Sequence, residues 1–148
     1  MQRSLVGSEM CIRDSRIIMS NAVQLAGEVV VEDWAIIGGG TLVHQFTHIG
    51  PHVMIQGGSQ VNKDIPPYAM IGRQPISYMG INSVGLNRRG YTQEQIETIN
   101  NVYRALYFSE LNFRDAIAKI EAEMPASAER NIIVDFVKNS PRGIVRKV

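Results

Sequence analysis

Aliphatic side chains recur at every sixth position through the first half of the chain. The series starts at Met19 and continues through Leu25, Val31, Ile37, Val43, Ile49, Ile55 and Val61. A second series, four residues after each member from Leu25 on, is small or β-branched throughout: Val29, Ala35, Thr41, Thr47, Val53, Ser59 and Ile65. A helix needs a period near 3.6 residues and a simple strand a period of 2, so neither accounts for this pattern.

A parallel β-helix does account for the six-residue period. Each hexapeptide would supply one short strand and one turn, and the aliphatic side chains of stacked coils would form one apolar column. Three hexapeptides close a coil, so Met19 to Ile65 covers about two and a half coils. We therefore predict a left-handed parallel β-helix over residues 16–68. Positive φ or close backbone approach is expected at the turn glycines Gly27, Gly38, Gly39, Gly50, Gly57 and Gly58.

The repeat stops at a pair of prolines. Pro66 and Pro67 lack the amide donors that strand stacking requires, so the solenoid is predicted to end by Tyr68. Residues 69–91 follow neither the six-residue repeat nor a helical period and are predicted to form an irregular connector.

Beyond the connector the pattern becomes helical. Thr92 and Gln95 form a capping box that starts an amphipathic helix. A second helix is expected after Asn112, and Pro125 separates it from a third. The apolar stripes of these helices are read as core, so residues 92–148 are predicted to form a small three-helix domain.

The first fifteen residues do not follow the repeat. Stepping back by six from Met19 gives Arg13 and Gly7, and neither can fill an apolar column. Residues 10–14 also resemble the in-frame translation of a sequencing-library adapter. We interpret residues 1–15 as an artefactual leader joined to the last coils of a longer solenoid, with a genuine divergent leader as the alternative.

Composition excludes several classes of protein. The formal net charge is +1, which gives no support to nucleic-acid binding, and 45% of residues are hydrophobic, as in ordinary soluble domains. No apolar run reaches the roughly 18 residues that span a bilayer. The single cysteine, Cys11, excludes an intramolecular disulfide, so we expect a cytoplasmic protein.

Three histidines are spaced by four residues. On a helix, His44, His48 and His52 would share a face, but in a solenoid of period six they fall at different points of the repeat. A metal site is therefore weakly supported, and His48 and His52 are read as structural or surface residues. His44 and Gln45 follow an inward-pointing residue and are expected at an outer corner, where a neighbouring subunit could meet them.

Arg88 and Arg89 form a second candidate site within the glycine-flanked segment 85–90. Paired guanidinium groups suit a diphosphate, because each can donate two parallel hydrogen bonds to phosphate oxygens. The alternative is a pair of solvated arginines on a loop, and the local sequence does not decide between the two.

Six segments together carry a resemblance to a known family: residues 21–27 (NAVQLAG), 36–39 (IIGG), 43–46 (VHQF), 64–68 (DIPPY), 80–82 (GIN) and 85–90 (GLNRRG). They strongly resemble the acyl-acyl carrier protein–UDP-N-acetylglucosamine O-acyltransferases of lipid A synthesis. The resemblance runs from about Arg16 to Arg146 and covers roughly the C-terminal half of such an enzyme. The combination of solenoid and Asn-Arg-Arg connector is the specific part, because other hexapeptide acyltransferases share only the solenoid.

The resemblance implies a cytoplasmic homotrimer with active sites between neighbouring subunits. Such an enzyme moves a 3-hydroxyacyl chain from acyl carrier protein to the glucosamine 3-hydroxyl of UDP-N-acetylglucosamine, the first step of lipid A synthesis. The resemblance implies no cofactor, no metal, no nucleic acid and no membrane span.

The resemblance also assigns roles to single residues. Gly27 matches the backbone amide that stabilises the oxyanion. The family's general base is a histidine one coil earlier, where this chain has Glu9, so we expect no transfer activity from this chain. Glu28 replaces a histidine found in many members, which leaves one sugar contact in doubt.

The remaining matches concern binding. His44 and Gln45 match residues that contact the acyl donor or the sugar nucleotide, and Gly57 matches the position whose bulk sets acyl length, so a glycine there implies a long chain. The residues that match the family's contacts to the UDP or pantetheine phosphates are Asn82, Arg88 and Arg89. Two other readings remain open: a zinc hydratase of the γ-carbonic anhydrase type, and a non-enzymatic solenoid used for binding or assembly.

Overall fold

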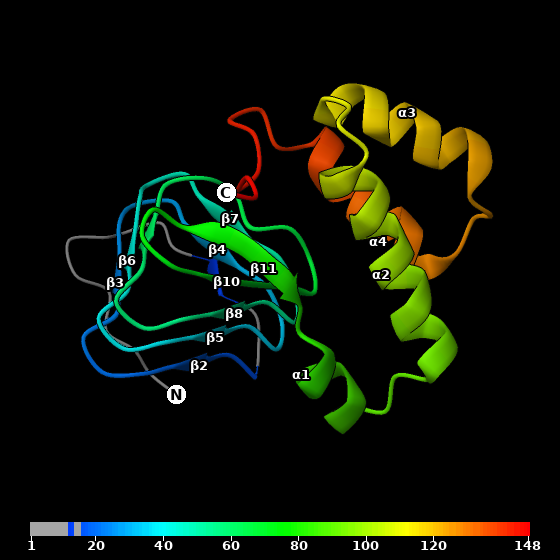
Figure 1. Ribbon diagram of the computed structural model, residues 1–148. Helices are drawn as coiled ribbons and strands as arrows, with labels where there is room; N and C mark the ends of the chain where they lie inside the picture. The colour runs from blue at the N-terminus through cyan, green and yellow to red at the C-terminus, as the bar shows by residue number, and fades with distance from the viewer. Residues whose placement is uncertain (1–11, 14–15) are drawn as a thin grey trace.

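The computed structural model describes residues 12–13 and 16–148 and shows a solenoid followed by helices (Figure 1). Two-residue strands build three faces of the solenoid. The first face contains β1 (Ile12–Arg13), β4 (Val30–Val31) and β7 (His48–Ile49). The second contains β2 (Ile18–Met19), β5 (Ile36–Ile37) and β8 (Met54–Ile55). The third contains β3 (Gln24–Leu25), β6 (Leu42–Val43) and β9 (Gln60–Val61).

Successive coils stack in parallel, as the six-residue period predicts. Residues eighteen apart are Cα partners, as in the pairs Val30–His48, Ile36–Met54 and Leu42–Gln60. The predicted aliphatic series from Leu25 to Val61 is buried, with no member more than 3% exposed. The small residues from Val29 to Ser59 are buried beside it. The interior is therefore the continuous apolar column of the predicted left-handed β-helix.

Each coil turns at three corners, which are named here by their residues. The aromatic corner joins the first face to the second and holds Trp34, His52 and Tyr68. The glycine corner joins the second face to the third and holds residues 38–41 and 56–59. The histidine corner joins the third face to the first and holds residues 26–29 and 44–47. One residue per corner takes a φ between 57° and 77°: Arg16, Ala22, Glu28, Trp34, Gly40, Phe46, His52 and Gly58.

Most of the turn glycines meet the expectation through close approach rather than through positive φ. Of the six that were expected to serve turns, only Gly58 has a positive φ. Others do allow close approach between coils: a Cβ on Gly38 would lie 2.4 Å from the backbone nitrogen of Gly57, and a Cβ on Gly50 would lie 2.8 Å from that of Pro67. Most positive-φ positions carry side chains instead.

The last coil is two residues shorter than the others. Ile65 pairs with Ile49 and Ile71 with Ile55, so the spacing is sixteen residues instead of eighteen. Ile65 thus occupies the inward aliphatic position and not the small-residue position that we assigned to it. The predicted end of the solenoid at Tyr68 is wrong. The two-residue shortening breaks the six-residue count, but the coils continue to stack beyond it.

The predicted connector, residues 69–91, is also largely ordered, contrary to expectation. β10 (Ala69–Gly72) pairs in parallel with β8 and antiparallel with β11 (Ser77–Ile81), which forms the edge of the second face. A short helix, α1 (Ser83–Arg88), follows directly and ends next to Arg89. Strand pairing rather than periodicity orders this segment, so the hydrophobic pattern gave no signal of it.

The three predicted C-terminal helices are present as α2 (Gln93–Phe108), α3 (Phe113–Glu123) and α4 (Ala128–Lys138). Both hydrogen bonds of the predicted capping box form: the Gln95 N–H donates to the Thr92 hydroxyl (3.1 Å), and the Thr92 N–H donates to the Gln95 side-chain oxygen (2.8 Å). The Asn112 side chain caps α3 by accepting from the Asp115 N–H (2.8 Å).

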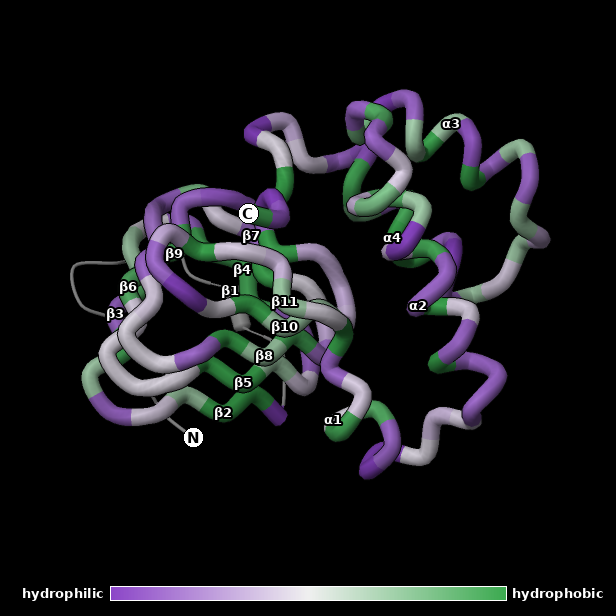
Figure 2. Tube along the Cα trace, in the orientation of Figure 1, coloured by the Kyte–Doolittle hydropathy of each residue, from purple (hydrophilic) through white to green (hydrophobic). Residues whose placement is uncertain are grey.

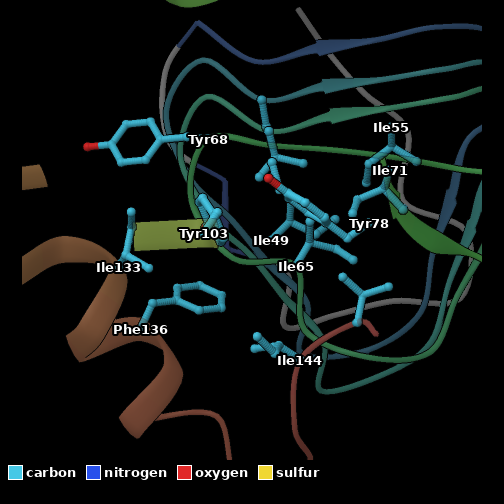
Figure 3. Close-up of a cluster of buried hydrophobic side chains, with 14 of the residues drawn as sticks. Ile49, Ile55, Ile65, Tyr68, Ile71, Tyr78, Tyr103, Ile133, Phe136 and Ile144 are labelled. Atoms are coloured by element: carbon cyan, nitrogen blue, oxygen red, sulfur yellow. The ribbon is translucent and has the colours of Figure 1, made fainter. Parts of the chain in front are cut away.

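The helices share a core with the solenoid (Figure 3). The Tyr103 hydroxyl of α2 donates to the carbonyl of Pro67, and the rings of Tyr78, Tyr103 and Tyr107 stack on one another. The C-terminal segment returns to the solenoid, where Ile144 forms a bridge with the buried Asp64. The helical part is therefore fixed against the last coil.

The N-terminal prediction concerns residues that are mostly outside the described ones. Gly7, Glu9 and Cys11 belong to that part, so the leader interpretation stays a prediction. The backbone of Ile12 and Arg13 does pair with β4, which extends the eighteen-residue register back by one coil.

Candidate functional site

A groove of about 780 Å³ runs along the outer side of the second face. Its floor is an apolar ladder of residues that stack in register, and Figure 2 shows the strands of this face as hydrophobic. The ladder within the groove consists of Ile36, Met54 and Met70. Polar groups stand beside it at α1, where Asn82, Arg88 and Arg89 line the same groove. The structure thus brings together all three residues that were predicted to hold phosphates.

Asn82 is buried and its side chain supports the framework. Its Oδ1 accepts from the Gly85 N–H (3.3 Å), which caps α1, and its Nδ2 donates to the His52 carbonyl (3.0 Å). Its own N–H donates to the Tyr68 carbonyl (2.7 Å). Asn82 therefore attaches the start of α1 to the aromatic corner and sets where the two arginines stand.

The two arginines have different surroundings. Arg88 is exposed, whereas Arg89 is half-buried against the aromatic corner. The Arg89 Nη1 donates to His52 Nδ1 (3.0 Å), and the Arg89 Cζ lies 5.0 Å from the centre of the Trp34 ring, a cation–π contact. Burial lowers the pKa of the Arg89 guanidinium below its ordinary value, and the neighbouring Arg88 charge lowers it further while Tyr91 raises it.

His52 is the functional neighbour that sequence reasoning missed. Its ring is 8% exposed and lies between Trp34 and Tyr68, with ring centres 6.3 Å and 5.6 Å away. Burial lowers the pKa of His52 to about 4, and the Arg89 charge adds to the effect, although Asp33 opposes it. The ring is thus neutral at pH 7. The available signal was the corner itself, since residue 52 stacks eighteen residues after Trp34.

A second group of predicted residues meets at the histidine corner. His44 and Gln45 are exposed, as expected for an outer corner, and they lie one coil beyond Gly27, whose carbonyl accepts from the Phe46 N–H (3.1 Å). His44 lines a groove of about 480 Å³ on the third face. Among the described residues, none accepts a hydrogen bond from the Gly27 N–H, and a Cβ there would meet no atom within 4 Å.

Gly57, the residue predicted to set acyl length, lies at the glycine corner. It is exposed, and a Cβ on it would lie 2.9 Å from the Gly39 carbonyl oxygen. Coil stacking therefore requires a small residue here, independently of any role in acyl-length selection.

Within one chain, the predicted site residues stay apart. They occupy three different corners, and the grooves at the histidine corner and at α1 share no lining residue. A single copy therefore does not assemble the whole predicted site.

The histidines do not converge on a common point either. His48 pairs with Glu32 and packs against Phe136 of α4, while His52 contacts Arg89. In residues 16–148, no group of three or more His, Cys, Asp or Glu side chains is arranged to hold a metal ion.

The fold and the grooves first define a class: a hexapeptide-repeat left-handed β-helix with an arginine-lined cleft and a helical C-terminal unit. Residues 64–145 match the family model described as UDP-N-acetylglucosamine O-acyltransferase, domain 2. The chain belongs to this acyltransferase family.

Individual relatives agree with this assignment. The chain is 41% identical over 136 residues to the acyl-[acyl-carrier-protein]–UDP-N-acetylglucosamine O-acyltransferase of Thiobacillus denitrificans, and 40% identical over 118 residues to that of Myxococcus xanthus. These alignments cover 92% and 80% of this chain but 53% and 46% of the relatives. The chain thus spans about half the length of the curated relatives it matches.

Solved structures give the same result. The UDP-N-acetylglucosamine acyltransferase of Bacteroides fragilis matches with a TM-score of 0.90 at 51% identity, covering 92% of this chain and 53% of that one. The Arabidopsis enzyme matches with a TM-score of 0.87 at 32% identity, covering 92% and 51%. Among the described residues, no helix is both long and apolar enough to cross a membrane.

Proposed function

We propose that this chain carries the nucleotide- and acyl-contacting part of an acyl-acyl carrier protein–UDP-N-acetylglucosamine O-acyltransferase, the first enzyme of lipid A synthesis. The observation that supports this most strongly is the groove beside α1. There, Arg88 and Arg89 offer guanidinium groups suited to a diphosphate, next to the apolar ladder of the second face. Such a groove suits both a charged nucleotide and an apolar chain.

The proposed reaction transfers a 3-hydroxyacyl group from acyl carrier protein to the glucosamine 3-hydroxyl. The thioester oxygen gains negative charge as the hydroxyl attacks, and the Gly27 N–H, which donates to no acceptor among the described residues, is suited to stabilise it. A general base must take the hydroxyl proton. Glu9 stands where the family has its histidine, so this chain supplies binding groups and an oxyanion donor but not that base.

We further propose that the active site forms between neighbours in a cytoplasmic homotrimer. The distribution of the site residues supports this, because His44 and Gln45 lie on one corner and Asn82, Arg88 and Arg89 adjoin another. A neighbour that presents its histidine corner to the α1 groove would combine the two sets. Gly57, on the third corner, is proposed to leave room for a long acyl chain.

Calorimetric binding of UDP-N-acetylglucosamine tests the proposal. Arg88→Ala removes an exposed, charge-assisted phosphate contact and is expected to weaken binding about tenfold or more, since such hydrogen bonds contribute about 1.5–3 kcal/mol. Arg104→Ala is the matched control, because Arg104 is also exposed but lies on α2, outside both grooves.

Two outcomes would count against the proposal. Absence of measurable binding to the unmodified chain would favour a non-enzymatic solenoid. Equal affinity of the Arg88→Ala and Arg104→Ala chains would place the nucleotide elsewhere.

A further inference from the structure

The aromatic corner is a column of side chains held in an uncommon backbone conformation. Trp34, His52 and Tyr68 have φ values of 70°, 60° and 69°, in the left-handed region that side-chain-bearing residues rarely adopt. Their rings stack one above another, with the planes of Trp34 and His52 inclined by 9° and those of His52 and Tyr68 by 21°. The same backbone conformation recurs at the other corners, so what distinguishes this corner is the stacked column of large side chains.

Two polar residues of the α1 groove form hydrogen bonds to His52. Asn82 donates to the His52 carbonyl, and Arg89 donates to the His52 ring, each at 3.0 Å. Gly85 makes room for this arrangement, because a Cβ there would lie 2.6 Å from Asn82 Nδ2 and 3.0 Å from Arg89 Nη1. Two of the three residues of the predicted phosphate site, Asn82 and Arg89, are therefore anchored to His52.

The hydrogen bond from Arg89 fixes the proton on the His52 ring. A guanidinium only donates, so His52 Nδ1 must be the acceptor and the ring proton must lie on Nε2. From there it donates to the Tyr91 hydroxyl, 3.2 Å away. The charged and titratable groups that face the ring are Arg89, Tyr68, Tyr91 and Asp33. A protonated ring would lose the acceptor and repel Arg89.

We propose that His52 is a positioning residue that, together with the face of Trp34, holds the Arg89 guanidinium in place for a nucleoside diphosphate. One N–H of Arg89 is committed to His52, and the group stands at the wall of the groove, where its other donors can meet phosphate oxygens. Arg88, which is exposed, then acts as a mobile partner. This inference rests on the proposed function, and it gives a reason for an imidazole, which can accept a hydrogen bond from Arg89, between the rings of Trp34 and Tyr68.

Two substitutions separate the acceptor from the ring. His52→Phe keeps an aromatic ring at the corner but removes the acceptor, and Phe46 shows that phenylalanine accepts this conformation in the same solenoid. His52→Asn removes the ring but keeps an acceptor oxygen near the Nδ1 position, and asparagine tolerates positive φ. We expect His52→Phe to weaken UDP binding about tenfold and His52→Asn to restore most of the affinity.

A double-mutant cycle distinguishes positioning from general support of the fold. If His52 acts through Arg89, His52→Phe should have no further effect on UDP affinity in an Arg89→Ala background. Additive losses in the double variant, or equal affinities of the wild-type and His52→Phe chains, would overturn the inference and leave the proposed function standing. A wild-type chain that binds no UDP would overturn the proposed function and the inference together, and circular dichroism would show that each variant is folded.

Discussion

At the scale of single residues, backbone strain is concentrated at the corners of the coils. Ala22, Glu28, Trp34, Phe46 and His52 all adopt the left-handed conformation, which costs roughly 1–2 kcal/mol for a residue that has a Cβ. Glycine would avoid this cost, and it does so at Gly40 and Gly58, in two successive coils of the glycine corner. At the aromatic corner, the ring contacts of Trp34, His52 and Tyr68 offset the strain, and Trp34 and His52 also hold Arg89.

His52 predicts a pH dependence of stability. Its pKa is about 4 in the folded chain, lowered by burial and by Arg89, and 6.5 without these effects. The unfolded chain therefore binds a proton before the folded chain does, and stability is lost as pH falls from about 6.5 to 4. The expected loss from this group is about 3 kcal/mol, measured as the free energy of unfolding in urea.

The His52→Asn chain is the control for this measurement, because it lacks the titrating ring. Its stability should fall less steeply between pH 6.5 and pH 4 than that of the wild type. Parallel pH profiles for the two chains would show that His52 does not titrate as the structure indicates.

The role of His52 could not be predicted from its sequence neighbours. The residues that define its environment are Trp34, which comes from another coil, and Arg89 and Tyr91, which follow α1. No periodicity predicted α1. Arg88 and Arg89, by contrast, stand next to each other in the sequence, so their chemistry was visible without the fold. The sequence revealed local chemistry and the stacking of coils but not the contacts between the aromatic corner and the segment after α1.

At the scale of elements, stacking of the coils is what makes the six-residue period visible. Inward side chains must be apolar in every coil, so the series from Leu25 to Val61 predicted the strands. The helices were predicted because Thr92 and Asn112 satisfy N-terminal amides through local hydrogen bonds. The shortened last coil was not predicted. A two-residue deletion breaks the count of six residues per strand, although Ile65 still pairs with Ile49.

Close contact between coils predicts opposite effects for two glycines. Gly38→Ala places a methyl group 2.4 Å from the Gly57 backbone nitrogen, so two coils must move apart. The free energy of unfolding should fall by about 1–3 kcal/mol, as for other overpacked sites. Among the described residues, a methyl group at Gly27 meets no atom within 4 Å, so Gly27→Ala should leave stability unchanged or slightly raised. Equal urea midpoints for the two variants would contradict this description of the packing.

At the scale of the whole molecule, the proposed site residues point in different directions. His44 and Gln45 lie at the histidine corner, and the arginines adjoin the aromatic corner. A three-sided coil does not bring its own corners together, so we propose that the complete site uses a second copy of the chain. The family relationship and this geometry lead to the same proposal, an assembly in which each site uses two subunits.

Binding of UDP-N-acetylglucosamine to mixed assemblies tests this central claim most directly. Chains carrying His44→Ala and chains carrying Arg88→Ala would be co-expressed with different affinity tags, and assemblies that contain both would be purified on both tags. If each site is shared, a mixed assembly contains a site with the intact histidine corner of one chain and the intact groove of its neighbour. Calorimetry should then show a tight binding phase that neither variant shows alone, whereas mixed assemblies that bind no more tightly than the separate variants would contradict the account.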